Sequence, residues 1–157
     1  MKQTTLVYIE KNGCYLMLHR IGKENDINKD KWIGVGGHFE NGETPQECMK
    51  REVFEETGLT VLSHKYCGEV TFISDIYENE QMHLFTVDGF EGELAECNEG
   101  KLEWISKEKL LSLPMWEGDK IFLELIANPK ENFFRLTLEY KGEKLQKAIL
   151  NKKTYHF

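Results

Sequence analysis

The chain has 157 residues, of which 40% are hydrophobic and 30% are charged, and this length and composition suit one globular domain with its own core. The formal net charge of −7, from 27 acidic and 20 basic residues, excludes a broad basic surface and therefore a nucleic-acid polymer as partner. The N-terminal segment lacks the apolar stretch of a signal peptide, and no apolar run approaches the roughly 20 residues that cross a membrane. We therefore expect a cytoplasmic protein with no membrane partner.

The first predicted elements are two antiparallel strands, TTLVYIE (residues 4–10) and CYLMLHR (residues 14–20). They flank Lys11, Asn12 and Gly13, and an Asn-Gly pair is a strong hairpin signal. Residues 21–31 are polar and have no apolar periodicity. We expect a mobile loop there, which ends at Trp32 and could cover a site.

A helix is predicted at about residues 45–57 by the strongest helix signals in the chain. Thr44 suits the N-cap, Pro45 the first helical position and Glu47 the capping box, and Gly58 follows the last turn. Further strands are predicted at residues 68–75, 81–92 and 101–106, a short helix at 106–113, an amphipathic helix at 118–128, and a closing hairpin of 133–140 and 144–150. Together these elements predict an α/β (α+β) sandwich with a mixed β-sheet between a few helices.

The four cysteines are scattered along the sequence, at Cys14, Cys48, Cys67 and Cys97. None of them has the CxxC spacing of a zinc site. We interpret them as free thiols, which suits a reducing compartment.

Carboxylates are concentrated on the helix predicted at residues 45–57. Glu52, Glu55 and Glu56 share one face, because residues three and four apart lie within an arc of about 100° on a helix. Bare carboxylates at this spacing repel one another, whereas Mg²⁺ and Mn²⁺ prefer such hard oxygen ligands. Most Glu-rich helices are simply solvated, so the helix alone leaves a metal site and a plain acidic surface both open.

The spacing of these acids with their neighbours is more specific. Residues 37–59 contain, in order, Gly37, Glu43, Arg51, Glu52, Glu55, Glu56, Gly58 and Leu59. This pattern resembles the Nudix box of the Nudix hydrolases at every defined position. The resemblance implies a single Nudix hydrolase domain over residues 1–157, with an α/β/α sandwich, that hydrolyses a nucleoside diphosphate derivative with Mg²⁺ or Mn²⁺. The implied metal ligands are Glu52, Glu55, Glu56 and the carbonyl of Gly36 or Gly37, and the residues implied to orient them are Glu43 and Arg51.

A hydrolase of this kind also needs a base that takes a proton from the attacking water. The candidates are a glutamate of the box and Glu99, which precedes the strand predicted at residues 101–106. Family members often carry a metal-binding or base glutamate at this place. The resemblance therefore makes Glu99 a candidate both for catalysis and for metal binding.

Segments that extend beyond the box resemble the MutT/MutX-type 8-oxo-dGTP diphosphatases of the family. They are residues 31–48, 98–104, 113–119 and 133–145. The resemblance implies a small purine nucleoside triphosphate as substrate, cleaved to the monophosphate and pyrophosphate, with Trp116 stacking on the base and Asp119 reading its edge. Two positions depart from the mammalian-type relatives, which carry an asparagine in place of Ile33 and an acid in place of Gly118. Either base recognition differs in detail or the substrate is another one.

Other residues are candidates for substrate contacts. By the resemblance, Arg20 corresponds to a basic residue that the relatives carry near the phosphates of the substrate. His38 occupies a variable position of the box, directly after Gly36 and Gly37. Trp32 is also a candidate, although core, loop hinge and site wall all remain open for it. The alternative functions are a Nudix hydrolase for ADP-ribose, a dinucleoside polyphosphate or an undamaged dNTP, and a non-catalytic nucleotide-binding module. We expect a monomer or a homodimer.

Overall fold

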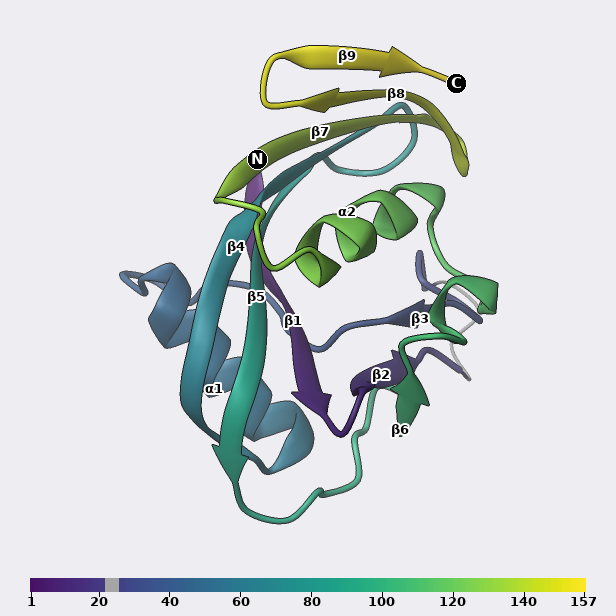
Figure 1. The fold of residues 1–157 in the computed structure, drawn as a ribbon. Coiled ribbons are helices and arrows are strands. Elements are labelled where there is room, and N and C mark those ends of the chain that lie inside the picture. The colour runs from purple at the N-terminus through teal and green to yellow at the C-terminus, as the bar shows by residue number, and fades with distance from the viewer. Residues whose placement is uncertain (22–25) are drawn as a thin grey trace.

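The computed structural model describes residues 1–21 and 26–157. Within them, nine strands form one mixed sheet in the order β3-β2-β1-β5-β4-β7-β8-β9, with β6 paired to β2 (Figure 1). The strands are β1 (Lys2–Lys11), β2 (Cys14–His19), β3 (Trp32–Ile33), β4 (Thr60–Ser74), β5 (Glu80–Glu91), β6 (Lys101–Ser106), β7 (Phe134–Lys141), β8 (Lys144–Leu150) and β9 (Lys153–His156). β1 runs parallel to β5 and β4 runs parallel to β7, whereas the other pairs are antiparallel.

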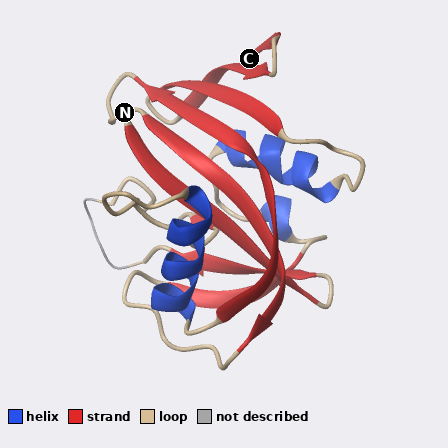
Figure 2. Ribbon diagram, turned by 90° about the vertical axis from the view of Figure 1, so that its left-hand side faces the viewer, coloured by secondary structure: helices blue, strands red, loops and turns tan. Residues whose placement is uncertain are grey.

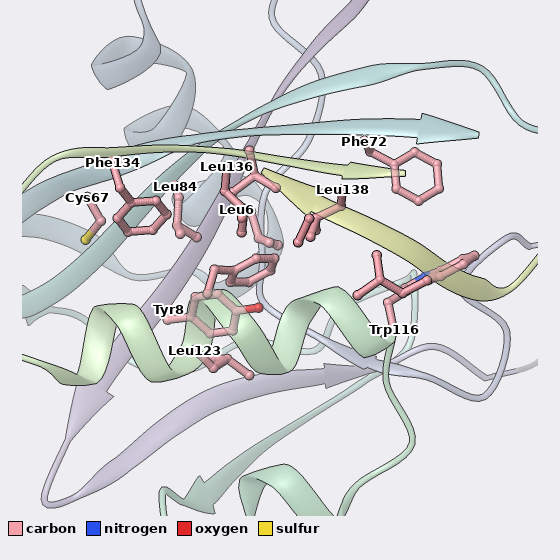
Figure 3. Packing of buried hydrophobic residues seen from close by; sticks show 14 of the residues in the cluster. Leu6, Tyr8, Cys67, Phe72, Leu84, Trp116, Leu123, Phe134, Leu136 and Leu138 are labelled. Carbon is pink, nitrogen blue, oxygen red and sulfur yellow. The ribbon is translucent and has the colours of Figure 1, made fainter. Parts of the chain in front are cut away.

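Two α-helices, α1 (Pro45–Thr57) and α2 (Glu117–Ala127), lie on opposite faces of the sheet (Figure 2). On one face, Met49 and Val53 of α1 are fully buried in a hydrophobic cluster. On the other face, Phe122 and Leu123 of α2 pack in a second cluster that includes Tyr8 of β1 (Figure 3). The predicted α/β/α sandwich with a mixed sheet is therefore confirmed. In the described chain, neither helix is long and apolar enough to cross a bilayer.

Most predicted elements are confirmed where local signals were strong. β1 and β2 pair as a hairpin, and Asn12 and Gly13 at its turn both have positive φ, 50° and 76°. The helix predicted at about residues 45–57 is α1, with a Thr44 capping box and a left-handed C-cap at Gly58. The closing hairpin is β7 and β8.

Other elements differ from the prediction. The short helix expected at residues 106–113 is one 3₁₀ turn, η1 (Leu110–Ser112). β4 begins at Thr60, eight residues before the predicted start. The prediction missed this first half because its residues are mostly exposed and lack the apolar alternation that marks a strand. β9 was not predicted, since all four of its residues are exposed. The loop expected at residues 21–31 includes residues 22–25, which lie outside the described residues.

The glycine-containing segment between β3 and α1 is held against β1. Val35 exchanges backbone hydrogen bonds with Val7 at 2.7 and 3.0 Å, and the Thr5 N–H donates to the Gly37 carbonyl at 2.9 Å. A Cβ added at Gly36 would lie 2.0 Å from the Thr5 carbonyl oxygen. Position 36 therefore has no room for a side chain, and this close approach fixes the segment between the sheet and the start of α1.

Candidate active site

The box acids are arranged around the guanidinium of Arg51. Arg51 binds Glu43 through two nitrogens, at 2.6 and 2.9 Å, and its Nη1 donates to Glu52 at 2.8 Å and to Glu55 at 3.0 Å. A fifth hydrogen bond runs from Nη2 to the His38 carbonyl at 3.0 Å. Arg51 thus ties the segment before α1 to two carboxylates of the helix.

These contacts contribute to different pKa values for the acids. Hydrogen bonds from Arg51 lower the pKa of Glu43 to about 2. Burial raises the pKa of Glu52 above its ordinary value, although Arg51 opposes this effect. Glu43 is therefore a permanent anion that fixes Arg51, while Glu52 lies in a site that favours a neutral group or a further cation.

Glu56 lies deeper than the other box acids. It is only 9% exposed, and its Oε2 accepts a 2.7 Å hydrogen bond from the Gly36 N–H. Burial raises its pKa well above the ordinary value, and a hydrogen bond with Glu99 raises it further. A buried carboxyl group whose charged form is disfavoured by a second acid forms a site that favours a bound cation.

Glu99 is also in contact with Arg20. The Nη1 of Arg20 donates to Glu99 at 3.1 Å, and its Nε donates to Asp26 at 2.7 Å. Because Asp26 belongs to the segment after β2, Arg20 links this segment to the acids at the end of α1.

A cavity of about 270 Å³ connects these acids with the N-terminal end of α2. Of the residues singled out from the sequence, its walls contain Arg20, Gly36, Gly37, His38, Glu99, Trp116 and Asp119. Glu43, Arg51, Glu52, Glu55 and Glu56 do not line it. Glu52 and Glu56 lie behind its Gly36–Gly37 wall, because a Cβ on Gly37 would be 2.6 Å from the Glu52 carboxyl carbon and the Gly36 N–H donates to Glu56.

Trp116 belongs both to the cavity wall and to the core. Its side chain is 6% exposed and packs edge-on against Phe72 and Tyr140, at centroid distances of 5.5 and 5.1 Å (Figure 3). Its indole N–H donates to Asn28 Oδ1 at 2.8 Å, and the ammonium of Lys31 lies 4.7 Å from the ring centroid. The indole is thus fixed from several sides.

Asp119 lies in the first turn of α2 and is 7% exposed. Burial raises the pKa of this carboxyl to about 8, and the charge of Glu80 contributes to the rise while Lys31 opposes it. At neutral pH the group is therefore mostly protonated, and it presents one donor and one acceptor to the cavity.

The remaining candidates lie as follows. Trp32 does not line the cavity: its ring stacks on His19 at 4.3 Å, and its backbone N–H donates to the Pro114 carbonyl at 2.8 Å. Ile33, one of the two departures from the MutT-type pattern, does line it. Gly118, the other, is buried in the first turn of α2.

No three His, Cys, Asp or Glu side chains are gathered into a metal-binding group among residues 1–21 and 26–157. The physical reason is that Arg51 holds Glu52 and Glu55, while Glu56 turns to Gly36. The donor set still fits a hard cation, because the half-buried Glu52 and the buried Glu56 have raised pKa values that a divalent ion would offset.

Sequence reasoning missed several residues of the cavity wall. They include Thr4, Asn28, Phe72, Glu80, Met82 and Tyr140. Asn28 lies in a polar segment without periodicity. The others belong to strands, where the alternation of side chains does not show which residues face the cavity. No local signal distinguishes them, because only the order of strands in the sheet brings them together.

Comparisons with known proteins agree with this arrangement. The NUDIX domain family model matches residues 3–126. The oxidized purine nucleoside triphosphate hydrolase of Danio rerio is 34% identical over 131 residues, covering 82% of this chain and 81% of that protein. The protein of the same name from Mus musculus is 27% identical over 110 residues, covering 69% of this chain and 70% of that protein. The crystal structure of a MutT protein from Bacillus halodurans has a TM-score of 0.84 at 28% identity, and the match covers 96% of this chain and 98% of that one. The chain is therefore an enzyme of the Nudix hydrolase family.

Proposed function

We propose that this Nudix hydrolase cleaves an oxidised purine deoxynucleoside triphosphate, 8-oxo-dGTP or a close analogue, to the monophosphate and pyrophosphate, with Mg²⁺ or Mn²⁺. Nudix hydrolases act on small nucleotides and generally use divalent metal ions. The observation that carries the proposal is one cavity with the Glu56–Glu99 acids beside one end and the Trp116 and Asp119 side chains at the other. The names of the zebrafish and mouse relatives support the same substrate class.

Glu52, Glu55, Glu56 and Glu99 would hold the metal, with a backbone carbonyl of the glycine segment. We favour Gly36 for this carbonyl, because the Gly37 oxygen already accepts from the Thr5 N–H at 2.9 Å and from the Cys48 thiol at 3.7 Å. When bound, the ion would neutralise phosphate oxygens and activate a water molecule.

The chain's own residues would position the reacting groups. Arg51 keeps the helix carboxylates oriented through its two bonds to Glu43. Glu99 lines the cavity and is 45% exposed at its side chain. We therefore assign to a Glu99 carboxylate oxygen the acceptance of the water proton. Arg20, 3.1 Å from Glu99, would face the phosphates of the substrate.

The other end of the cavity would bind the base. Trp116 supplies an aromatic surface, and Asp119 a buried carboxyl group for the edge of the purine. The cavity volume of about 270 Å³ is close to the lower bound of small-molecule sites. This volume suits the base of a nucleotide whose phosphates extend out of the cavity toward α1.

We place this reaction in the cytoplasm, on the free nucleotide pool, where removal of oxidised purines prevents their use in DNA synthesis. The four cysteines have free thiols, which agrees with a reducing compartment. The acidic net charge of −7 supports a small nucleotide rather than a nucleic-acid polymer as partner. We propose that the enzyme works as a monomer or a homodimer.

The test is release of pyrophosphate from 8-oxo-dGTP, dGTP, dATP and ADP-ribose, each with Mg²⁺, with Mn²⁺ and with EDTA. The proposal expects metal-dependent turnover with the highest kcat/KM for 8-oxo-dGTP. Preference for ADP-ribose would contradict the substrate assignment, and turnover in EDTA would contradict the metal assignment. Binding without turnover of any compound would support the non-catalytic module instead.

A further inference from the structure

The first turn of α2 has no room for an acid at position 118 unless neighbouring side chains shift. A Cβ on Gly118 would lie 2.6 Å from the Tyr140 hydroxyl and 2.5 Å from a methyl carbon of Leu138. The Gly118 N–H also donates to that hydroxyl at 2.7 Å. An acid there, which the mammalian-type relatives carry, would require Leu138 and Tyr140 to shift, and with Gly118 this chain has one carboxyl group fewer on α2.

A different element supplies a second carboxylate to the same cavity. Glu80, the first residue of β5, lines it together with Asp119 and Trp116. One oxygen of Glu80 accepts from the Thr4 hydroxyl at 2.6 Å, and the other lies 3.5 Å from the Lys2 ammonium. These contacts hold the side chain, which is 22% exposed, in place. Each of its oxygens keeps a lone pair for a ligand.

Asp119 and Glu80 offer different hydrogen-bonding groups. In the described part of the chain, no hydrogen bond or ion pair reaches the Asp119 carboxyl oxygens, although the residue is 93% buried and lines the cavity. Both side chains line the same cavity, and the charge of Glu80 contributes to the raised pKa of Asp119. The pair therefore presents one neutral carboxyl group and one carboxylate.

This set matches the edge of guanine. Guanine presents its O6 acceptor, its N1–H donor and its 2-amino donor side by side, whereas adenine has no 2-amino group. A neutral carboxyl group can donate to O6 and accept from N1–H. The 2-amino group then needs a second acceptor.

We propose that Glu80 is a specificity-determining residue that accepts a hydrogen bond from the purine 2-amino group, in place of the acid that is absent at Gly118. This inference rests on the proposed function and narrows its substrate class to 2-aminopurine nucleotides, the guanine series. Asp119 reads the neighbouring O6 and N1 atoms.

The experiment compares kcat/KM for dGTP and dITP, which differ only in the 2-amino group, in the wild type and in Glu80→Gln. Glutamine keeps the shape and can still accept from Thr4, but it lacks the negative charge. We expect the wild-type kcat/KM to be about tenfold or more higher for dGTP than for dITP. Glu80→Gln should remove most of this preference by lowering kcat/KM for dGTP. Glu78→Gln, an exposed acid two residues away, is the matched control and should keep the wild-type ratio.

Equilibrium binding of dGMP and dIMP, measured by calorimetry with the same proteins, gives the comparison without turnover. An unchanged dGTP-to-dITP ratio in Glu80→Gln, or a wild type that does not distinguish the two, overturns the inference and leaves the proposed function intact. A loss confined to dATP would assign Glu80 to the adenine 6-amino group and also overturn it. If the wild type hydrolyses and binds no nucleotide, the proposed function itself has failed.

Discussion

Glu56 combines the deepest burial among the box acids with the strongest departure from ordinary ionisation. It is 9% exposed, and burial and Glu99 together hold its pKa well above the usual range. Its retention as an acid therefore costs stability in the metal-free protein. A structural role alone would favour glutamine, which accepts the same bond from Gly36.

We therefore predict opposite effects of Glu56→Gln on activity and stability. Turnover should fall by about 100-fold or more, because a charged metal ligand is lost. The Tm without metal should stay the same or rise, and the increase in Tm on adding Mg²⁺ or Mn²⁺ should shrink. Kinetics and thermal unfolding measure both effects, with Glu124→Gln, exposed on α2, as control. Wild-type turnover in Glu56→Gln would exclude the metal assignment.

Trp116 requires a conservative test because it is also part of the core. Replacement by Ala would open a cavity and cost about 3–5 kcal/mol of folding stability, so lost activity would be ambiguous. Trp116→Phe keeps an aromatic ring but loses stacking area and the bond to Asn28. KM should rise several-fold for purine triphosphates and less for a pyrimidine triphosphate, with little change in kcat. Trp104→Phe, whose indole stacks on Phe90 away from the cavity, should leave KM unchanged.

The buried carboxyl group of Asp119 predicts a pH dependence of stability. Its pKa is about 8 in the folded protein and 3.8 in an ordinary setting. Between these two pH values, the folded state keeps a proton that the unfolded chain has lost. The contribution of Asp119 to the free energy of unfolding is therefore full below about pH 4 and is lost as the pH rises to about 8. The slope from one such group is at most about 1.4 kcal/mol per pH unit.

Asp119→Asn should flatten this dependence. Urea unfolding of wild type and variant at several pH values between 4 and 8 gives the difference in unfolding free energy, in which contributions from Glu56 cancel. Glu80, Lys31, Tyr8 and Tyr140 face Asp119 and remain in both proteins. Parallel profiles for the two proteins would show that Asp119 titrates normally.

At the scale of elements, α1 is specified by signals at its own ends. The Thr44 hydroxyl accepts from the Glu47 N–H at 3.2 Å, and the Glu47 carboxylate accepts from the Thr44 N–H at 2.9 Å. These are contacts between residues three apart in sequence, so the sequence predicts them directly. β4 and β9 lack comparable local signals, and pairing with neighbouring strands determines them.

The capping box predicts a measurable cost for its loss. Thr44→Ala should lower the free energy of unfolding by about 1 kcal/mol, as measured by urea unfolding. Thr154→Ala, on the exposed strand β9, changes the same side chain without a cap and should have a smaller effect. Equal effects of the two substitutions would contradict the role of the cap.

At the scale of the molecule, the cavity lies where the sheet, α2 and the segment around Asn28 meet, and none of its described lining residues belongs to β9. Among the described strands, β9 is an edge strand that pairs with β8 (Figure 1), and all four of its residues are exposed. The NUDIX family model ends at residue 126, so a single Nudix domain that extends to residue 157 stays a prediction. The remaining strands β7, β8 and β9 belong to the same sheet, and β7 contributes Leu138 and Tyr140 to the cavity.

Removal of β9 should therefore leave the active site intact. A chain truncated after Asn151 should keep its kcat/KM and a Tm within about 3 °C of the full-length value, because little apolar surface is lost. Truncation after Glu131, which also removes β7 with its buried Phe134, Leu136 and Leu138, should abolish folding. Loss of activity in the shorter deletion would show that β9 supports the site.

The sequence by itself determined the family-defining pattern of residues 37–59, the ends of α1 and the hairpin turn at Asn12-Gly13. These features depend on spacing and on contacts between residues a few positions apart, which one strand or helix can express alone. Only the tertiary structure decided which groups surround the base end of the cavity. The strand order brings Glu80, Asn28 and Tyr140, which come from three separate segments, to Trp116 and Asp119. The close packing of α2 against β7 leaves no space for an acid at Gly118 unless its neighbours shift.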